Sequence, residues 1–249
     1  ALPTAARGVA VDGQRKIAYV AGGDGGLYVV DVADPAAPAL QQTVAIPGGA
    51  QSVLLRDGAV VVGGNGLFVL NGITGEVLTS VAGRGIKALA GEGSTVFAVE
   101  GNERLLSYDF DGTVLVRQSV VTMPTPPVRR QAFDDFEIFV NDGVARIANG
   151  LDLAVVAPAR PLERGGYVSF DVSDPRDMRL LSNIDTPEVA AGNLETVVNG
   201  SGLALVAAGR QGLEVHRAAD PAVTYDLVTR FAVPDSAEAV AAAGGFAYV

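Results

Sequence analysis

Arginine side chains gather in one stretch of this 249-residue chain, although its net charge is −10. The planar guanidinium binds carboxylate or sulfate groups through two parallel hydrogen bonds, so these arginines suit an acidic partner. We predict a binding surface for a protein or an acidic glycan here. Alternatively, the arginines pair with the acids of the same stretch and form a neutral surface insertion. The predicted binding residues are Arg129, Arg130, Asp134, Asp135, Arg160, Glu163 and Arg164.

Catalytic chemistry has few candidates in this sequence. His216 is the only histidine and there is no cysteine, which excludes sites that need two histidines or a thiolate. A lone histidine can serve as a general base or metal ligand. Its repeat position matches Val30 and Phe170, so we predict that it fills a strand. We therefore predict no catalytic residue, no metal site and no cofactor. A metal site would depend on carboxylates alone, which suit hard cations such as Ca²⁺, but the sequence has no calcium-binding motif.

Acidic residues recur where the third β-prone run of each repeat ends. Asp31, Asp109 and Asp171 occupy this place, and Asn71 occupies it in the second repeat. They could line a cation site, but we predict that each accepts hydrogen bonds from backbone amides of its own turn. The glycine-rich segment 21–26 could cradle an anion. It lacks a lysine and a following helix, so we predict a turn between strands.

An internal repeat organises the chain and must position these residues. The segment Gly26–Pro35 returns at residues 166–175 and 212–221, and weaker copies start at Gly66 and Arg104. Each copy holds four short runs rich in Val, Ile, Leu, Tyr and Phe, separated by Gly, Asp, Asn and Pro. No sustained helical periodicity occurs. The pattern predicts an all-β fold: a β-propeller of four-stranded blades, as a single domain over residues 1–249.

The repeat also predicts the individual strands and their core. In the first copy we expect strands at 8–12, 17–21, 26–32 and 40–46. Apolar residues of the third strands should be buried between blades, because side chains alternate between faces. These core positions are Leu27, Val29, Leu67, Val69, Leu105, Tyr167, Leu213 and Val215.

Blade counting gives five full blades plus part of a sixth. The final residues Phe246–Val249 nearly copy Ile17–Val20, so a five-blade ring would put both at one place. We therefore expect six or more blades, and a sequence that is a piece of a longer protein. In blade 4 we expect an insertion at about residues 124–143 and a long loop at 158–165. Both connections should lie on the same face of the blade, where binding loops are usually carried.

The repeat core resembles that of the LVIVD-repeat proteins. The resemblance rests on Gly26–Pro35, on Pro47–Ala50 and on Ala18–Ala21. It implies a propeller fold and a bacterial or archaeal protein that is secreted or lies at the cell surface. It implies no established activity and no catalytic residues to transfer to this chain.

Charge and hydropathy narrow the function further. The acidic balance argues against a nucleic acid partner, which needs clustered lysine and arginine. No uninterrupted apolar run reaches the length of a membrane span, about 18 residues. We predict a non-enzymatic extracellular or cell-surface propeller that acts as an interaction or adhesion module.

Two alternatives stay open. One is a lactonase-like propeller hydrolase with a carboxylate-bound divalent metal in the central channel, and the other is a purely structural spacer in a large surface protein. The hydrolase needs acids at the starts of the first strands. The residues there are mostly basic, which fits a metal poorly: Arg7, Gln51, Arg84, Lys87, Arg146 and Glu195.

Overall fold

Antiparallel β-sheets account for the fold of this chain. The structure is a computed structural model that describes residues 2–101, 103–123, 136–149, 166–181, 193–196, 202–208, 211–223, 226–237 and 239–249. Within these ranges the elements are strands joined by turns, and none is a helix long and apolar enough to cross a membrane. The chain divides into two compact units, residues 1–119 and 120–249, which are described separately.

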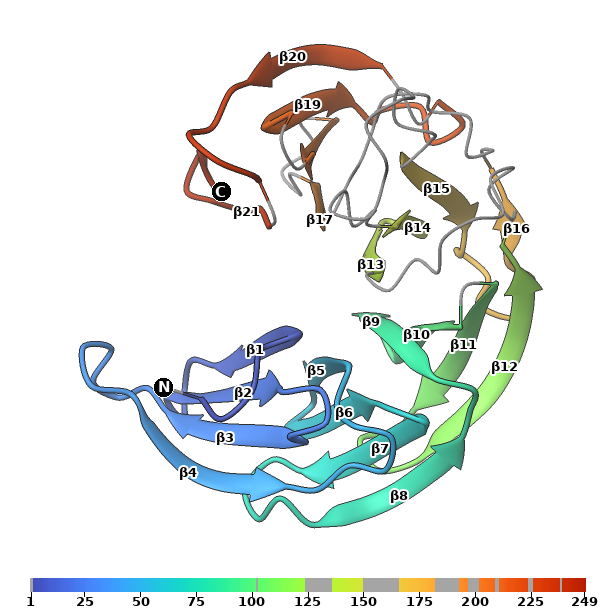
Figure 1. The fold of residues 1–249 in the computed structure, drawn as a ribbon. Helices are drawn as coiled ribbons and strands as arrows, with labels where there is room; N and C mark the ends of the chain where they lie inside the picture. The colour runs from blue at the N-terminus through green and yellow to red at the C-terminus, as the bar shows by residue number, and fades with distance from the viewer. Residues whose placement is uncertain are drawn as a thin grey trace, which may run out of the picture. The chain divides into compact units, whose positions relative to one another are not determined.

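The first unit holds three consecutive four-stranded sheets, each with its strands side by side in chain order (Figure 1). Their strands are β1 (Gly8–Asp12), β2 (Ile17–Ala21), β3 (Leu27–Asp31) and β4 (Ala39–Val44); β5 (Ser52–Arg56), β6 (Ala59–Gly63), β7 (Gly66–Asn71) and β8 (Val77–Ala82); and β9 (Ile86–Glu92), β10 (Thr95–Glu100), β11 (Arg104–Phe110) and β12 (Leu115–Thr122). The last strand, β12, runs three residues past the unit boundary. The four strands of the first sheet confirm the predicted runs to within two residues.

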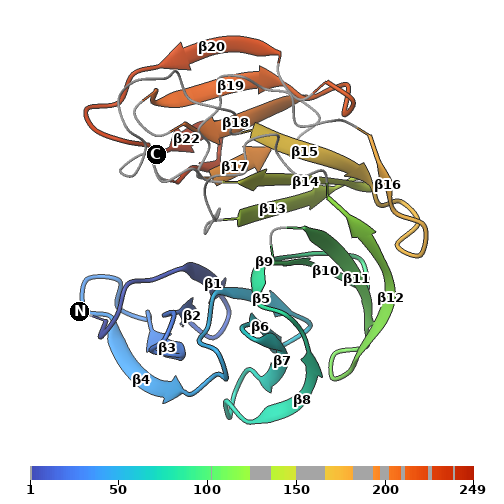
Figure 2. The same ribbon diagram turned by 45° about the vertical axis from the view of Figure 1, so that its right-hand side comes forward.

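The second unit repeats the same arrangement (Figure 2). Its four-stranded sheets consist of β13 (Phe136–Asn141), β14 (Val144–Asn149), β15 (Gly166–Asp171) and β16 (Arg179–Leu180), and of β17 (Asn193–Thr196), β18 (Leu203–Ala207), β19 (Leu213–Arg217) and β20 (Leu227–Phe231). A two-stranded sheet of β21 (Ala241–Ala243) and β22 (Phe246–Tyr248) follows. The described strands thus form five complete sets of four and one set of two. Whether residues 1–249 form a single domain stays a prediction.

The expected insertion at 124–143 is wrong in its second half. Residues Phe136–Asn141 are β13, the first strand of the fourth sheet, which pairs with β14 through a two-residue Asp142–Gly143 turn. Both turn residues have positive φ, 50° and 70°, as a type I′ hairpin requires. The second strand β14 pairs directly with β15, so their connection spans 150–165 instead of 158–165. Residues 124–135 and 150–165 lie outside the described ranges.

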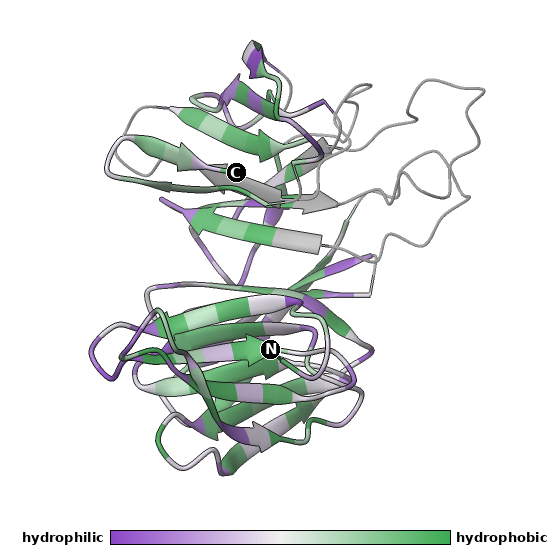
Figure 3. Ribbon diagram, turned by 60° about the vertical axis from the view of Figure 1, so that its left-hand side comes forward, coloured by the Kyte–Doolittle hydropathy of each residue, from purple (hydrophilic) through white to green (hydrophobic). Residues whose placement is uncertain are grey.

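Hydrophobic residues predominate in the strands of the first unit (Figure 3), and its facing sheets enclose the apolar core. Leu27 and Val29 of β3 pack with Val60 and Val62 of β6, between the first and second sheets. The opposite face of the second sheet presents Leu67 and Val69 to the third sheet. The prediction of buried third-strand residues is confirmed for Leu27, Val29, Leu67, Val69, Leu105, Leu213 and Val215. The side chain of Tyr167 lies outside the described set.

The glycine-rich segment 21–26 is the predicted turn, and its glycines make room for an aromatic ring. Tyr28 is 1% exposed, and its hydroxyl lies 2.8 Å from that of Thr4. A Cβ atom on Gly22 or Gly25 would overlap the side chain of Tyr28. The ring of Tyr28 therefore fills the space beside the turn, which explains why Gly22 and Gly25 have no side chain.

Adding a methyl group at Gly22 should destabilise the first unit. We expect Gly22→Ala to lower the free energy of unfolding by about 1–3 kcal/mol, because the buried ring of Tyr28 must shift. Gly13→Ala is the matched control, since nothing lies within 4 Å of its Cβ position. Urea titrations of both variants test this. Equal stability of the two would contradict the packing of Tyr28 against the turn.

Candidate functional site

Two kinds of connection meet at one end of the first unit. We call this the loop end; it comprises the turns between second and third strands and the connections between sheets, at residues 22–26, 45–51, 64–65, 83–85, 101 and 103. Backbone hydrogen bonds join them: Gly23 and Ala50 exchange two bonds of 2.8 Å, and Gly101 N–H donates to the Gly85 carbonyl at 2.8 Å. In this unit both kinds of connection lie at the same end of the sheets; the corresponding connections of blade 4 lie outside the described residues, so the expectation for them stays a prediction.

The third sheet departs from its neighbours at the loop end. Register places Glu100 where the first two sheets have Gly22 and Gly64, and Arg104 where they have Gly26 and Gly66. A Cβ atom at Gly26 or Gly66 would collide with backbone of the adjacent fourth strand. The third sheet therefore has a pair of charged residues at the two positions where the first two sheets have closely packed glycines.

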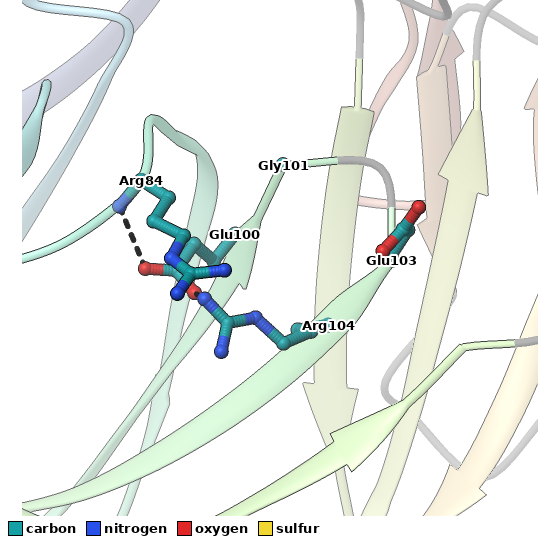
Figure 4. Close-up of a pocket in the computed structure, with 5 residues that line it drawn as sticks. All are labelled: Arg84, Glu100, Gly101, Glu103 and Arg104. Atoms are coloured by element: carbon teal, nitrogen blue, oxygen red, sulfur yellow. Dashed lines mark hydrogen bonds and ion pairs between the residues drawn. The ribbon is translucent and has the colours of Figure 1, made fainter.

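A pocket of about 360 Å³ opens at this charged pair. Its lining residues come from the connection before β9, the end of β10, the β10–β11 turn and the start of β11: Arg84, Glu100, Gly101, Glu103 and Arg104 (Figure 4). The guanidinium groups of Arg84 and Arg104 lie beside the Glu100 carboxylate, whereas the Glu103 carboxylate points away from them. The lining thus carries two positive and two negative charges, and both guanidinium groups are gathered around Glu100 alone.

Glu100 positions the two arginines. Its side chain is 5% exposed, and Oε1 accepts a hydrogen bond of 2.7 Å from the backbone N–H of Arg84. Its Oε2 forms an ion pair with Nη2 of Arg104. Among the described residues none forms a hydrogen bond or ion pair with the Arg84 guanidinium, which is exposed. Arg84 therefore has its five donors available to a ligand.

The opposite end of the sheets carries the acidic turn residues, which bind backbone as predicted. Oδ1 of Asp31 accepts the N–H of Ala33 at 2.8 Å, and that of Asp171 accepts the N–H of Ser173 at 3.0 Å. Bonds from the Ser173 hydroxyl and N–H hold the pKa of Asp171 below its usual value. These carboxylates are thus occupied by their own turns.

The third sheet corrects one of these assignments. Asp109 accepts only the Ser94 hydroxyl, at 3.2 Å, and makes no described bond to turn amides. Asp111 takes that role, because its Oδ1 accepts the N–H groups of Thr113 and Val114, both at 2.8 Å. These bonds, that of Val114 first, hold the pKa of Asp111 below its usual value. In the third sheet the residue that binds the turn amides therefore lies two residues after Asp109, the position that corresponds to Asp31 and Asn71.

Asparagine should replace Asp111 without loss of the turn at neutral pH. Asn71 makes the same two contacts in the second sheet, to the N–H groups of Ile73 and Thr74 at 2.8 and 3.1 Å. We expect Asp111→Ala to lower the urea midpoint and Asp111→Asn to restore most of it. Because the pKa of Asp111 is lowered in the folded chain, its carboxylate stabilises the fold at pH values above the ordinary aspartate pKa. This stabilisation is lost as the pH falls through the lowered pKa. The asparagine variant should lack that acid-dependent loss; asparagine as harmful as alanine would refute the turn role.

A second charged group lies buried in the second unit. Glu214 and His216 alternate on one face of β19, both fully buried, with Nε2 of His216 2.9 Å from Oε2 of Glu214. Nε of Arg230, on β20, donates to Oε1 of Glu214 at 2.8 Å. Burial raises the pKa of Glu214, but the bonds to His216 and Arg230 outweigh it and leave the pKa below its usual value.

Burial of His216 agrees with the prediction that it fills a strand position. Its partners Glu214 and Arg230 are not predicted from the sequence. One signal was present, since Glu214 takes the repeat position of the buried Tyr28. The likewise missed Glu100 takes a glycine position. A charged residue at a position that is apolar or glycine in other copies of the repeat therefore marks both clusters.

The residues predicted to bind a partner at blade 4 are not among those described. Arg129, Arg130, Asp134, Asp135, Arg160, Glu163 and Arg164 all lie in the ranges 124–135 and 150–165. Within the described ranges, no three His, Asp or Glu side chains come together as a possible metal site.

Comparison with solved structures defines the class of the fold. The computationally designed Ika8 protein superposes with a TM-score of 0.63 at 13% identity, over 99% of this chain and 68% of its own. BamB from Moraxella catarrhalis superposes with a TM-score of 0.60 at 14% identity, over 98% of this chain and 80% of its own. Both are similar in fold, and the chain is a β-propeller protein of four-stranded blades.

Comparison of sequences adds the repeat type. Residues 4–45, which contain the whole first sheet, match the family model of the LVIVD repeat. The resemblance stated from the sequence is confirmed over this segment. No curated protein matches the chain in sequence.

Proposed function

We propose that this chain is a non-enzymatic propeller, extracellular or at the cell surface, that binds a protein or an acidic glycan through the loop end of its sheets. The observation that carries the proposal is the pocket of about 360 Å³, which holds the exposed Arg84 and the ion-paired Arg104. Its size is in the range of small-ligand pockets, about 300–1,000 Å³. Polar groups on connections held by rigid sheets are the usual form of a binding site.

The charge balance supports the type of partner. The chain as a whole carries −10, so a nucleic acid is disfavoured and long-range attraction of an acidic glycan is weak. Binding therefore depends on close contacts with the arginines. The arginines predicted at blade 4 are proposed as a second contact of the same kind. The location at the cell surface is supported by the resemblance to LVIVD-repeat proteins.

A binding assay with a turnover arm tests the proposal. The purified chain is titrated with polygalacturonate, hyaluronate and neutral dextran, and separately incubated with a set of lactones in the presence of Ca²⁺ or Mg²⁺. We expect saturable binding of at least one acidic glycan and no turnover. Metal-dependent lactone hydrolysis would instead favour the hydrolase, and absence of binding to every acidic glycan would refute the proposed glycan function.

A further inference from the structure

We infer that the pocket at Arg84, Glu100 and Arg104 binds a single uronic acid residue of a glycan, with the Arg84 guanidinium holding its carboxylate. This inference rests on the proposed function and gives that site its ligand. It is carried by the arrangement of the two arginines around a buried glutamate, at the point where the third sheet departs from the repeat.

The two arginines carry one more positive charge than Glu100 balances. Glu100 compensates one of the two arginines through its ion pair with Arg104. The second positive charge, on Arg84, is left without a described counterion, and the Glu103 carboxylate points away. A bound carboxylate would balance this charge through two parallel N–H···O bonds to Arg84.

The backbone around Arg84 is rigid. The backbone of Arg84 is held by the 2.7 Å bond to Glu100, and the adjacent Gly85 carbonyl accepts the N–H of Gly101. Glu100 itself is nearly inaccessible to solvent. The backbone that carries Arg84 is therefore fixed before a ligand arrives, which lowers the entropic cost of binding.

A sugar acid offers this pocket more polar groups than an acidic side chain does. All lining residues lie at one end of the third sheet and on the connection before it, so they surround a compact acidic group. A uronic acid unites a carboxylate with ring hydroxyls. Its hydroxyls can donate to Glu103, an exposed lining residue, whereas the side chain of an acidic peptide offers only its carboxylate beyond its backbone.

Matched ligands and matched arginines test the inference. The probes are a trimer of galacturonic acid, its methyl ester, which lacks the charge, and a hexaglutamate peptide. The variants of the full chain are Arg84→Ala, Arg84→Lys and the control Arg117→Ala, an exposed arginine on β12. Affinity is measured by isothermal titration calorimetry, and folding by the thermal midpoint.

The wild-type chain should bind the trimer about tenfold or more tightly than the ester or the peptide. Arg84→Ala should weaken binding of the trimer by about tenfold or more without changing the thermal midpoint, and Arg84→Lys should recover only part, since lysine lacks the fork. Arg117→Ala should match the wild type.

Three outcomes would overturn the inference. These are no binding of the trimer by the wild-type chain, Arg84→Ala within about twofold of wild type, or equal affinity for the trimer and its ester. Preference for hexaglutamate would point to a protein partner instead. If Arg84→Ala bound polygalacturonate as tightly as the wild type, the proposed function would stand and only this site would be refuted.

Discussion

Truncation of Leu27 to alanine is expected to lower the free energy of unfolding by about 2–5 kcal/mol. The side chain is 1% exposed and packs between the first two sheets with Ile46, Val60 and Val62. Its removal loses apolar burial and leaves a cavity that the paired strands can fill only partly, because hydrogen bonds to both neighbouring strands hold β3 in place.

A urea titration followed by circular dichroism measures this loss. The matched control is Ile73→Ala in the β7–β8 turn, where the side chain is 75% exposed and the change should stay within about 0.5 kcal/mol. If Leu27→Ala were as stable as Ile73→Ala, Leu27 could not be part of the core between sheets.

Removal of Glu214 should also destabilise the fold, for a different reason. Glu214→Ala leaves the fully buried His216 ring and the partly exposed Arg230 without their shared carboxylate, and the loss of such a buried hydrogen-bonded group costs about 1–3 kcal/mol. Arg217→Ala is the control on the same strand. Its pair with Asp226 is solvent-exposed, so its loss should cost about 1 kcal/mol or less.

The acid dependence of stability provides an independent check on Glu214. Its folded pKa is lowered, so the ionised side chain stabilises the fold above the ordinary glutamate pKa and this effect is lost as pH falls below it. In Glu214→Gln this part of the acid destabilisation should disappear. Urea titrations across the acidic pH range measure this. If the stability of the variant and that of the wild type fell equally with pH, Glu214 would not be the source of the acid destabilisation.

The sequence predicts the sheets well because each strand and turn of the repeat is determined by residues that are close together in sequence. β-branched runs, Asp-Pro turns and spaced glycines each determine a strand or a turn without long-range information, so the first sheet is placed to within two residues. The fourth sheet was misplaced because its first strand, Phe136–Asn141, lacks a recognisable copy of the repeat and follows a segment of unrelated composition. Its Asp142–Gly143 turn was the local signal that identifies the hairpin.

The charged clusters were harder to predict because they depend on contacts between strands. Glu100 and Arg104 meet across the β10–β11 pair, and Arg84 reaches them from the preceding connection. Glu214 meets Arg230 across β19 and β20. Composition alone drew attention to the arginines between residues 124 and 165, which is where charge is dense in sequence. The pocket instead arises where isolated charges replace glycines of the repeat.

The most direct test of the account is an NMR titration of arginine side-chain Nε–H signals with the galacturonic acid trimer. The Arg84 signal, assigned through its loss in Arg84→Lys, should shift progressively to saturation while the Arg117 signal stays in place. An Arg84 signal that does not move at saturating trimer would contradict the account. Shifts confined to Arg129, Arg130, Arg160 or Arg164 would contradict it equally, and would move the binding site to blade 4.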